Sequence, residues 1–324
     1  MIVENVMYCP IVIRDSGVGI AEESKKIFAH EGSVASREFV PQIQGEKDIE
    51  KIRMPELCAD WEETERRFGI MEELLGDLVS IEKRGVPGRW FAPWDELIRW
   101  WGVEQAMLDL SLRPELVHMA MDRLVTSYLL RLDQWEDLEV LALNNRPIRV
   151  GSGGYGCSDE LPSSDFDQAH IRAKDLWGCA TAQIFSEVSP EMHEEFALQY
   201  EMRWLKRFGM TYYGCCEPLH NKIDLLRTIP NLRKISTSPK ADIVKTVQET
   251  DGDYVISFKP NPALLAEDSW EPDRVRSYLT ENLEKTRGCP VEVILKDIST
   301  VRFEARRLWE WTEVAKEVTE TFGN

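Results

Sequence analysis

The chain has 324 residues, of which 43% are hydrophobic and 30% are charged, a composition typical of folded globular proteins and not of disordered or collagen-like chains. It carries 57 Asp and Glu against 39 Lys and Arg, so its formal net charge at pH 7 is -18. Because this surplus of negative charge repels nucleic-acid phosphates and anionic lipids, we expect neither nucleic acid nor a membrane as a partner.

No apolar stretch approaches the roughly 18 to 20 residues that a membrane-spanning helix needs, and the first residues lack the basic and apolar segments of a secretory signal. We therefore expect a cytoplasmic protein. The seven cysteines are an odd number spread over a long chain, which argues against a disulfide framework. We expect most of them to be small buried side chains, and only the adjacent pair Cys215 and Cys216 has a spacing that suggests chemistry.

The first half of the chain contains three expected strands and a long helix. A β-branched strand is expected at 6–13, and the apolar segment 78–81 leads into a glycine-containing loop. Pro114 begins a helix whose apolar residues recur at spacings of three and four, which indicates one buried face. A further strand is expected at 139–143, ending at two asparagines.

The second half alternates more regularly. Ser189 is expected to cap a helix that has Pro190 in its first turn, an aromatic stripe typical of core packing, and Gly209 at its end. An amphipathic helix is also expected near the C-terminus. Between these two helices we expect strands at 210–215, 232–236, 254–258 and 291–295, and helices at 222–228, 241–249 and 272–285.

This alternation predicts an α/β fold with a parallel sheet, because parallel neighbours need crossover connections, which are usually helices. The number of strands fits a (β/α)8 TIM-type barrel better than an open doubly wound sheet, although spacing alone leaves both open. Since the sequence has no linker, repeat or low-complexity tract, we expect a single barrel domain over residues 1–324.

In such a barrel, the residues beyond the C-terminal ends of the strands converge on one mouth. The polar residues at these ends are therefore candidates for the functional site. We expect Asn144, Asn145, Ser236 and Asn261 to bind substrate, and Glu187, Lys259, Lys296 and Asp297 to act in catalysis.

The most informative run is 212–220. Since side chains alternate along a strand, Tyr213, Cys215 and Glu217 are expected on one face. A thiolate from Cys215 or Cys216, the Glu217 carboxylate and the His220 imidazole would make a zinc site with a position open for a substrate thiol or water. The alternative is that the cysteines are two small buried side chains.

Lys259 and Lys296 end apolar strands, where a charge is costly unless it is paired or bound to a ligand. They would hold an anionic substrate or form ion pairs with Glu217 or Asp297, and the sequence leaves both readings open. Glu187 is expected to act as an acid, a base or a metal ligand, or to pair with one of these lysines.

The segment 151–156 matches the dinucleotide fingerprint G-x-G-x-x-G, but no helix follows it. We therefore expect a flexible loop over the mouth instead of a nucleotide site.

The segment 186–196, with Tyr200 and the cysteine strand, resembles the uroporphyrinogen decarboxylase superfamily, and is closest to its corrinoid-dependent methyltransferase branch. The stretches 101–104 and 109–115 resemble that superfamily's Gly-x-Glu and Asp-Pro-Glu segments. The resemblance runs from about residue 85 to the C-terminus. It implies an α/β barrel whose members decarboxylate a porphyrinogen without a cofactor, or move methyl groups between a corrinoid and a small thiol or methylated substrate, often with zinc.

Cys215 falls at the cysteine of the family's His-x-Cys pair, but Tyr213 occupies the histidine position. Lys296 and Asp297 stand where the methyltransferases have a later cysteine. The family's first barrel strand has no counterpart before Val6, so the barrel is expected to lack it. Zinc would then need ligands from the set Cys216, Glu217, His220 and Glu187.

From this resemblance we expect a methyltransferase-type enzyme that moves a methyl group between a small methylated compound or thiol and a corrinoid (cobalamin) carried by a partner protein. Cys215 and Glu217 would bind zinc or the thiol. The alternative is a cofactor-free, decarboxylase-like lyase acting on a small carboxylic acid. A third interpretation is a non-catalytic protein that binds a corrinoid protein or a small acid at the mouth. A homodimer is left open.

Overall fold

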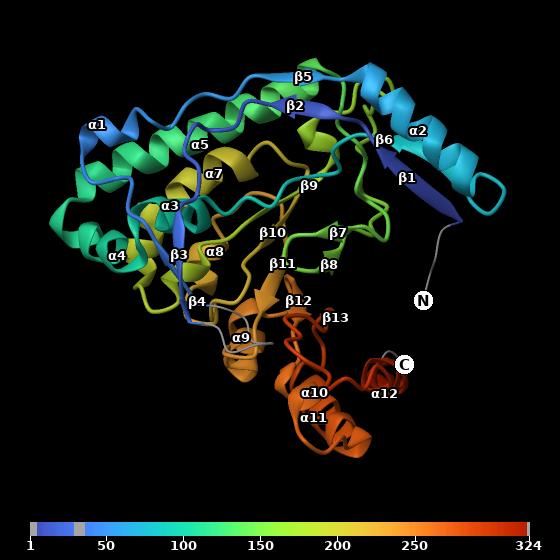
Figure 1. The fold of residues 1–324 in the computed structure, drawn as a ribbon. Coiled ribbons are helices and arrows are strands. Elements are labelled where there is room, and N and C mark those ends of the chain that lie inside the picture. Colours follow the sequence, from blue (N-terminus) through green and yellow to red (C-terminus); the bar gives the residue numbers. More distant parts are fainter. Residues whose placement is uncertain (1–4, 29–35, 323–324) are drawn as a thin grey trace.

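The computed structural model describes residues 5–28 and 36–322 and contains a five-stranded sheet with the order β13-β12-β11-β10-β9 (Figure 1). Every ladder in this sheet is parallel, so the C-terminal ends of its strands lie along one edge. The strands are β9 (Trp177–Ala180), β10 (Met210–Tyr213), β11 (Leu232–Thr237), β12 (Val255–Phe258) and β13 (Val291–Val293).

Helices connect these strands, as parallel neighbours require. The predicted α/β fold with a parallel sheet is therefore confirmed. A π-helical segment at 194–198 joins the first two of these helices. The helices are α6 (Pro190–His193), α7 (Gln199–Leu205), α8 (Ile223–Leu226), α9 (Ile243–Thr250), α10 (Ala263–Ala266) and α11 (Pro272–Lys285), and α12 (Arg306–Phe322) follows β13.

The N-terminal half adds further parallel segments. β1 (Val6–Pro10) pairs with β6 (Ser80–Arg84), and just beyond β6 Val86 forms a parallel bridge with Leu141. The side chain of Asn144 extends this series to β9: its Oδ1 accepts a hydrogen bond of 2.9 Å from the backbone N–H of the first β9 residue.

Along the chain, each parallel segment thus neighbours the next, as in the order of strands in a (β/α)8 barrel. β1 is the first segment of this series, which the sequence comparison had expected to be missing. Among the described residues, however, no ladder joins β13 to β1, so the strands do not form a closed barrel. Closure requires the first and last strands to pair. The spacing of the strands along the sequence does not indicate whether they do.

Helices before the sheet form a thick layer in which α5 is the longest element (Figure 1). As predicted, α5 begins at Pro114, and its buried face includes Val117 and Leu124. The Phe91 ring, just before α3, stacks on Trp204 of α7 with 4.7 Å between ring centroids. The helices are α1 (Glu46–Ile49), α2 (Trp61–Leu75), α3 (Pro93–Trp101), α4 (Val103–Leu112) and α5 (Pro114–Asp137), and the short antiparallel pairs are β2 (Ile13–Asp15) with β5 (Leu57–Ala59) and β3 (Ser24–Phe28) with β4 (Ser36–Phe39).

Two of the expected strands are interrupted by residues with positive φ. The segment 139–143 contributes only the bridge at Leu141. Its first residue, Glu139, has a left-handed φ of 54°, which lies outside the β region. β10 stops at Tyr213, because Gly214 has a φ of 97°. This early end determines where the two cysteines lie.

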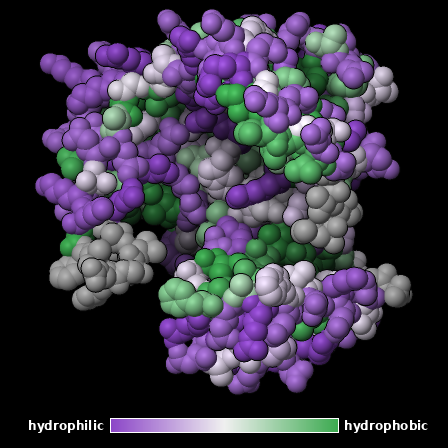
Figure 2. Space-filling model, turned by 45° about the vertical axis from the view of Figure 1, so that its right-hand side comes forward, coloured by the Kyte–Doolittle hydropathy of each residue, from purple (hydrophilic) through white to green (hydrophobic). Residues whose placement is uncertain are grey.

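A recess lies on one face of the molecule, between its larger upper part and its lower part, with hydrophobic residues along parts of the rim (Figure 2). The rest of this face is mostly hydrophilic. Within the described ranges, no helix combines the length and apolarity needed to cross a bilayer.

Candidate active site

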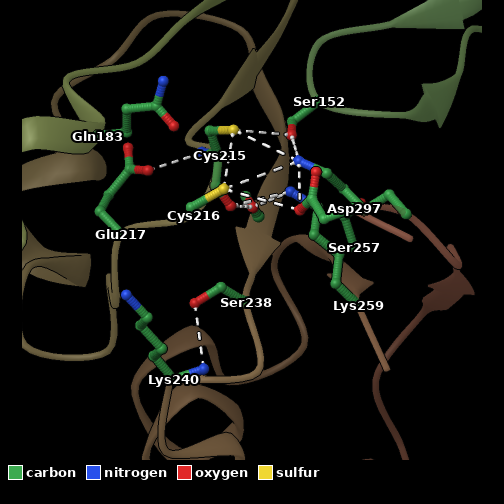
Figure 3. Close-up of polar contacts among 12 residues, drawn as sticks. Ser152, Gln183, Cys215, Cys216, Glu217, Ser238, Lys240, Ser257, Lys259 and Asp297 are labelled. Carbon is green, nitrogen blue, oxygen red and sulfur yellow. Dashed lines mark hydrogen bonds and ion pairs between the residues drawn. The ribbon is translucent and has the colours of Figure 1, made fainter. Parts of the chain in front are cut away.

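Polar side chains from neighbouring strand ends meet at the C-terminal edge of the parallel sheet (Figure 3). Cys215 and Cys216 follow β10, and Ser236 lies near the end of β11. Lys259 follows β12, and Lys296 lies just beyond β13. All five are candidates that the sequence singles out, and they come together because the strands that carry them are parallel neighbours.

The sulfur of Cys215 is surrounded by hydrogen-bond donors. Ser152 Oγ donates at 3.2 Å, Cys216 Sγ lies 3.4 Å away, and Lys296 Nζ donates at 3.5 Å. The hydrogen bond from Cys216 is the main cause that lowers the pKa of Cys215 to about 5, against the effect of burial. Ser152 and the charge of Lys296 act in the same direction. Cys215 is therefore a thiolate at neutral pH.

Cys216 is the protonated partner of this pair. Its hydrogen bond to Cys215, together with burial, raises the pKa of the Cys216 thiol. Its sulfur also lies 3.8 Å from Asp297 Oδ2 and 3.9 Å from Lys296 Nζ. The two sulfurs thus share one proton, and Cys216 is the more exposed of the two.

Two lysines of different character flank the thiolate. Lys259 is 1% exposed, and its ammonium donates to Ser236 Oγ and, at 3.0 Å, to the carbonyl oxygen of Cys215. Burial, reinforced by the charge of Lys296, lowers the pKa of Lys259 to about 8. Burial opposes ionisation of Lys296 as well, but Cys215, Asp297 and Cys216 together outweigh it and raise the pKa of Lys296.

Ser152 reaches the site from the turn of a hairpin formed by β7 (Arg149–Val150) and β8 (Gly154–Tyr155). Gly151 has a φ of 56°, and a Cβ there would lie 2.3 Å from the Tyr212 ring, so glycine allows the hairpin to press onto β10. The loop predicted to be flexible is therefore a paired and packed hairpin. The sequence drew attention to its glycines but gave no signal for Ser152.

The cysteines leave β10 through a turn that Glu217 supports. One Glu217 oxygen accepts the backbone N–H of Cys215 at 2.9 Å, and the other accepts the Thr181 hydroxyl at 2.7 Å. Glu217 is fully buried, and burial raises its pKa. The prediction that Tyr213, Cys215 and Glu217 share one strand face is wrong, because the left-handed Gly214 breaks the alternation.

Behind β10 lies a buried chain of hydrogen bonds that the sequence did not predict. The Lys222 ammonium lies 3.0 Å from His193 Nδ1, and His193 Nε2 lies 2.6 Å from the Tyr213 hydroxyl, which donates to Glu201 at 2.7 Å. Burial lowers the pKa of His193 to about 3 and raises that of Glu201 to about 8. Because Lys222 follows the cysteine turn, this chain fastens the turn to the helices behind the sheet.

Five other predicted site residues make different contacts. His220 accepts a hydrogen bond of 3.2 Å from a backbone N–H at the start of α9. Asn144 and Asn145 donate to backbone carbonyls, and Asn261 caps the start of α10. Glu187 is exposed. Within the described part of the chain, none of them forms a hydrogen bond or ion pair with the cysteines.

The donors at the cysteine pair do not fit a zinc ion. No three His, Cys, Asp or Glu side chains among the described residues are grouped to hold a metal. The Lys296 ammonium already approaches both sulfurs and neutralises their charge. Glu217 is turned toward the backbone and Thr181, and His220 toward α9. The site offers a thiolate paired with an ammonium.

No protein-family model matches the sequence, and no curated protein sequence matches it either. The fold is similar to the solved structure of a methyltransferase from Methanosarcina mazei, with 11% sequence identity and a TM-score of 0.47. The match covers 84% of this chain and 73% of that one. A similarity this distant does not indicate what the present chain binds or does.

Proposed function

We propose that this chain is an enzyme of the methyltransferase type that uses the Cys215 thiolate as its nucleophile. One observation supports this above all: the thiolate is held by Ser152 and Lys296 at the C-terminal edge of a parallel sheet. Proteins with parallel α/β sheets bind their ligands at this edge. The thiolate is also the form of sulfur that attacks carbon.

In the proposed step, a lone pair of the Cys215 sulfur forms a bond to the methyl carbon of the donor. The bond between that carbon and the donor's leaving atom breaks, and both of its electrons stay with the leaving group. Cys215 becomes a neutral thioether. The positive charge of Lys296 is then balanced by Asp297, whose carboxylate lies 3.1 Å away.

The methyl donor would be a small methylated compound or a methylated corrinoid on a partner protein. The corrinoid rests on the sequence resemblance alone. No step is assigned to zinc, because the donors around Cys215 do not fit it.

The test is to incubate the protein with methylcobalamin, a methylated amine or a methylated thioether, and to map methylation by peptide mass spectrometry. We expect one added methyl group on Cys215, none on the Cys215→Ser variant, and continued methylation of Cys216→Ser, whose hydroxyl still donates to the thiolate. If no donor methylates Cys215 while iodoacetamide still alkylates it at about pH 6, where an ordinary thiol is protonated, the proposal is refuted.

A second candidate is the lyase acting on a small carboxylic acid, and one observation favours it. Lys259 lies beside Cys215 with its pKa lowered to about 8, so it can exchange a proton near neutral pH. This alternative expects release of carbon dioxide that is lost in Lys259→Met and retained in Cys215→Ser. The opposite pattern, or no release from any small carboxylic acid, would exclude it.

A further inference from the structure

A pocket of about 430 Å³ lies beside the cysteine site. Two arginines, Arg89 and Arg149, line it, together with Trp90 and Trp177. No Asp or Glu is among its lining residues. The lining is therefore locally cationic in a protein of net charge -18, although Arg89 lies 3.7 Å from the Glu96 carboxylate outside it. Such a local reversal of sign attracts anions out of solution.

Arg149 has a free guanidinium. Its side chain makes no hydrogen bond or ion pair with any described residue, although its backbone pairs in the β7–β8 hairpin. Arg149 also lines an adjoining pocket of about 440 Å³, whose wall includes Lys296 and Asp297. It therefore lies between the pocket lined by the two arginines and the Lys296 ammonium that holds the thiolate.

Arg89 has unused donor capacity as well. Its Nε is buried and has no hydrogen-bond partner. The nearest carboxylate, that of Glu96, lies 3.7 Å from the guanidinium, which is too long for a hydrogen bond. A buried donor without an acceptor is costly, so an acceptor supplied by a ligand would relieve it.

We propose that this pocket binds a small organic carboxylate, whose carboxylate group pairs with Arg149 and Arg89 while the rest of the molecule extends toward Cys215. The proposal rests on the function given to Cys215 above and names its substrate class. A planar guanidinium matches a carboxylate through two parallel hydrogen bonds. Trp90 and Trp177 among the lining residues offer apolar surface for the carbon skeleton.

The pocket is joined to the thiolate by the chain itself. Gly151 lines the pocket, and the next residue, Ser152, donates to the Cys215 sulfur. A molecule held at Arg149 therefore lies against the same hairpin whose Ser152 contacts the nucleophile. This arrangement binds the anionic end of a substrate and leaves its other end to react.

Alkylation kinetics test the inference without requiring methyl transfer. Iodoacetate is itself a small carboxylate with an electrophilic carbon, and iodoacetamide is its neutral counterpart. We expect iodoacetate to alkylate Cys215 with saturation kinetics, and iodoacetamide to react without saturation. Mass spectrometry of the Cys215 peptide separates this reaction from that of the exposed cysteines Cys58 and Cys157.

Arg149→Gln removes the charge while retaining a polar side chain of similar reach. We expect it to weaken iodoacetate saturation on the order of tenfold and to leave the iodoacetamide rate within about twofold. The matched control is Arg53→Gln, an exposed arginine that lines neither pocket. It is expected to leave both reagents unchanged.

Competition identifies the ligand class. We expect benzoate to protect Cys215 from iodoacetate in the parent and in Arg53→Gln but not in Arg149→Gln, and benzamide to protect none of them. Stronger protection by inorganic phosphate than by benzoate would overturn the carboxylate assignment. Equal saturation by iodoacetate in Arg149→Gln and the parent would overturn the site, whatever the outcome of the methylation test.

Discussion

Lys296 contacts both sulfurs of the cysteine pair, and its charge helps to keep Cys215 ionised. We expect Lys296→Met to raise the pKa of Cys215 from about 5 toward its ordinary value. At about pH 6 the fraction of thiolate then falls, and the rate of alkylation by iodoacetamide falls roughly tenfold for each unit that the pKa rises above 6. The measurement is the pH profile of alkylation at Cys215.

The control for this substitution is Lys240→Met, which removes an exposed lysine near the site (Figure 3). It is expected to leave the profile in place. A profile that does not move in Lys296→Met would show that the neighbouring hydroxyl and thiol alone sustain the charge.

The two sulfurs are also placed for oxidation. With hydrogen peroxide, the Cys215 thiolate attacks one oxygen and forms a sulfenic acid with release of hydroxide, and the Cys216 thiol then displaces water to give a disulfide. Because adjacent Cα atoms are only about 3.8 Å apart, shorter than most disulfides span, we expect a bond that mild thiols reduce quickly.

Peptide mass spectrometry before and after dithiothreitol checks this prediction. Cys216→Ser is expected to stop at the sulfenic acid or proceed to higher oxides. A peroxide-treated parent that shows only these oxides would contradict the predicted disulfide.

At the level of elements, the turn that ends β10 depends on Gly214. An added Cβ would meet Leu219 Cδ1 at 2.4 Å and Ser236 Cβ at 3.0 Å, and φ is already 97°. We expect Gly214→Ala to lower the free energy of unfolding by roughly 3 kcal/mol and to displace the cysteines, so that rapid alkylation at low pH is lost. Denaturant unfolding and iodoacetamide labelling measure the two effects.

Gly17→Ala is the matched control, because Gly17 also has a positive φ, of 73°, but a Cβ there meets nothing within 4 Å. It is expected to cost roughly 1 kcal/mol and to leave labelling unchanged. Equal losses in the two variants would show that backbone strain alone, without the clash, accounts for the effect.

The buried chain between α6, α7 and β10 makes stability depend on pH. Glu201 has a pKa raised to about 8 in the folded protein, so the folded state binds more protons than the unfolded state above the ordinary glutamate pKa. The stabilisation of the fold that comes from this raised pKa is fully present below about pH 4.5. It is lost as the pH rises through about 8. Glu201→Gln, which resembles the protonated form, should remove this loss.

We therefore expect Glu201→Gln to gain stability relative to the parent between about pH 5 and about pH 8, by a few kcal/mol. Denaturant unfolding at the two pH values measures the change. Exposed Glu313→Gln serves as the control and is expected to show no such gain. A relative loss would show that the Glu201 carboxylate is ionised in the fold.

The sequence predicted most of the elements in the second half of the chain. The expected helix at 272–285 coincides with α11, and β11 extends the expected strand by one residue. These boundaries were readable because apolar runs end at turn residues or a proline. The early end of β10 could not be predicted in this way, because a glycine can either continue a strand or end it. Here the packing of Gly214 against Leu219 and Ser236 determines that the strand ends.

Strand ends anticipated which of the candidate residues lie together, whereas contacts that cross the fold were not anticipated. Cys215, Lys259 and Lys296 were found because parallel strands bring their ends together. Ser152 and the chain from Lys222 to Glu201 were missed, because those contacts join hairpins, helices and strands through packing that has no local pattern.

For the whole molecule, net charge is the dominant electrostatic feature. Most ion pairs of the described residues involve exposed side chains, and such pairs contribute little. Repulsion within a chain of net charge -18 therefore outweighs them. We expect the melting temperature to rise by a few degrees between about 10 mM and about 150 mM sodium chloride. A fall would mean that the surface pairs matter more than the net charge.

The parallel order of the segments was predictable at this scale, but barrel closure was not. Alternating strands and helices determine which segments follow one another, whereas closure requires β13 and β1 to pair across the full length of the chain. The N-terminal strand was correctly located at Val6, yet its place at the head of the series emerged only from its pairing with β6.

The hairpin that carries Ser152 also carries Arg149 and lines the pocket beside the cysteine site. One short segment of backbone therefore takes part in two equilibria: proton dissociation from the Cys215 sulfur and ligand binding in the neighbouring pocket. Thermodynamic linkage makes their influence mutual, so whatever factor an occupant imposes on the acidity of Cys215, deprotonation imposes on the affinity for that occupant. Titrating the thiol with and without an occupant would measure this communication directly.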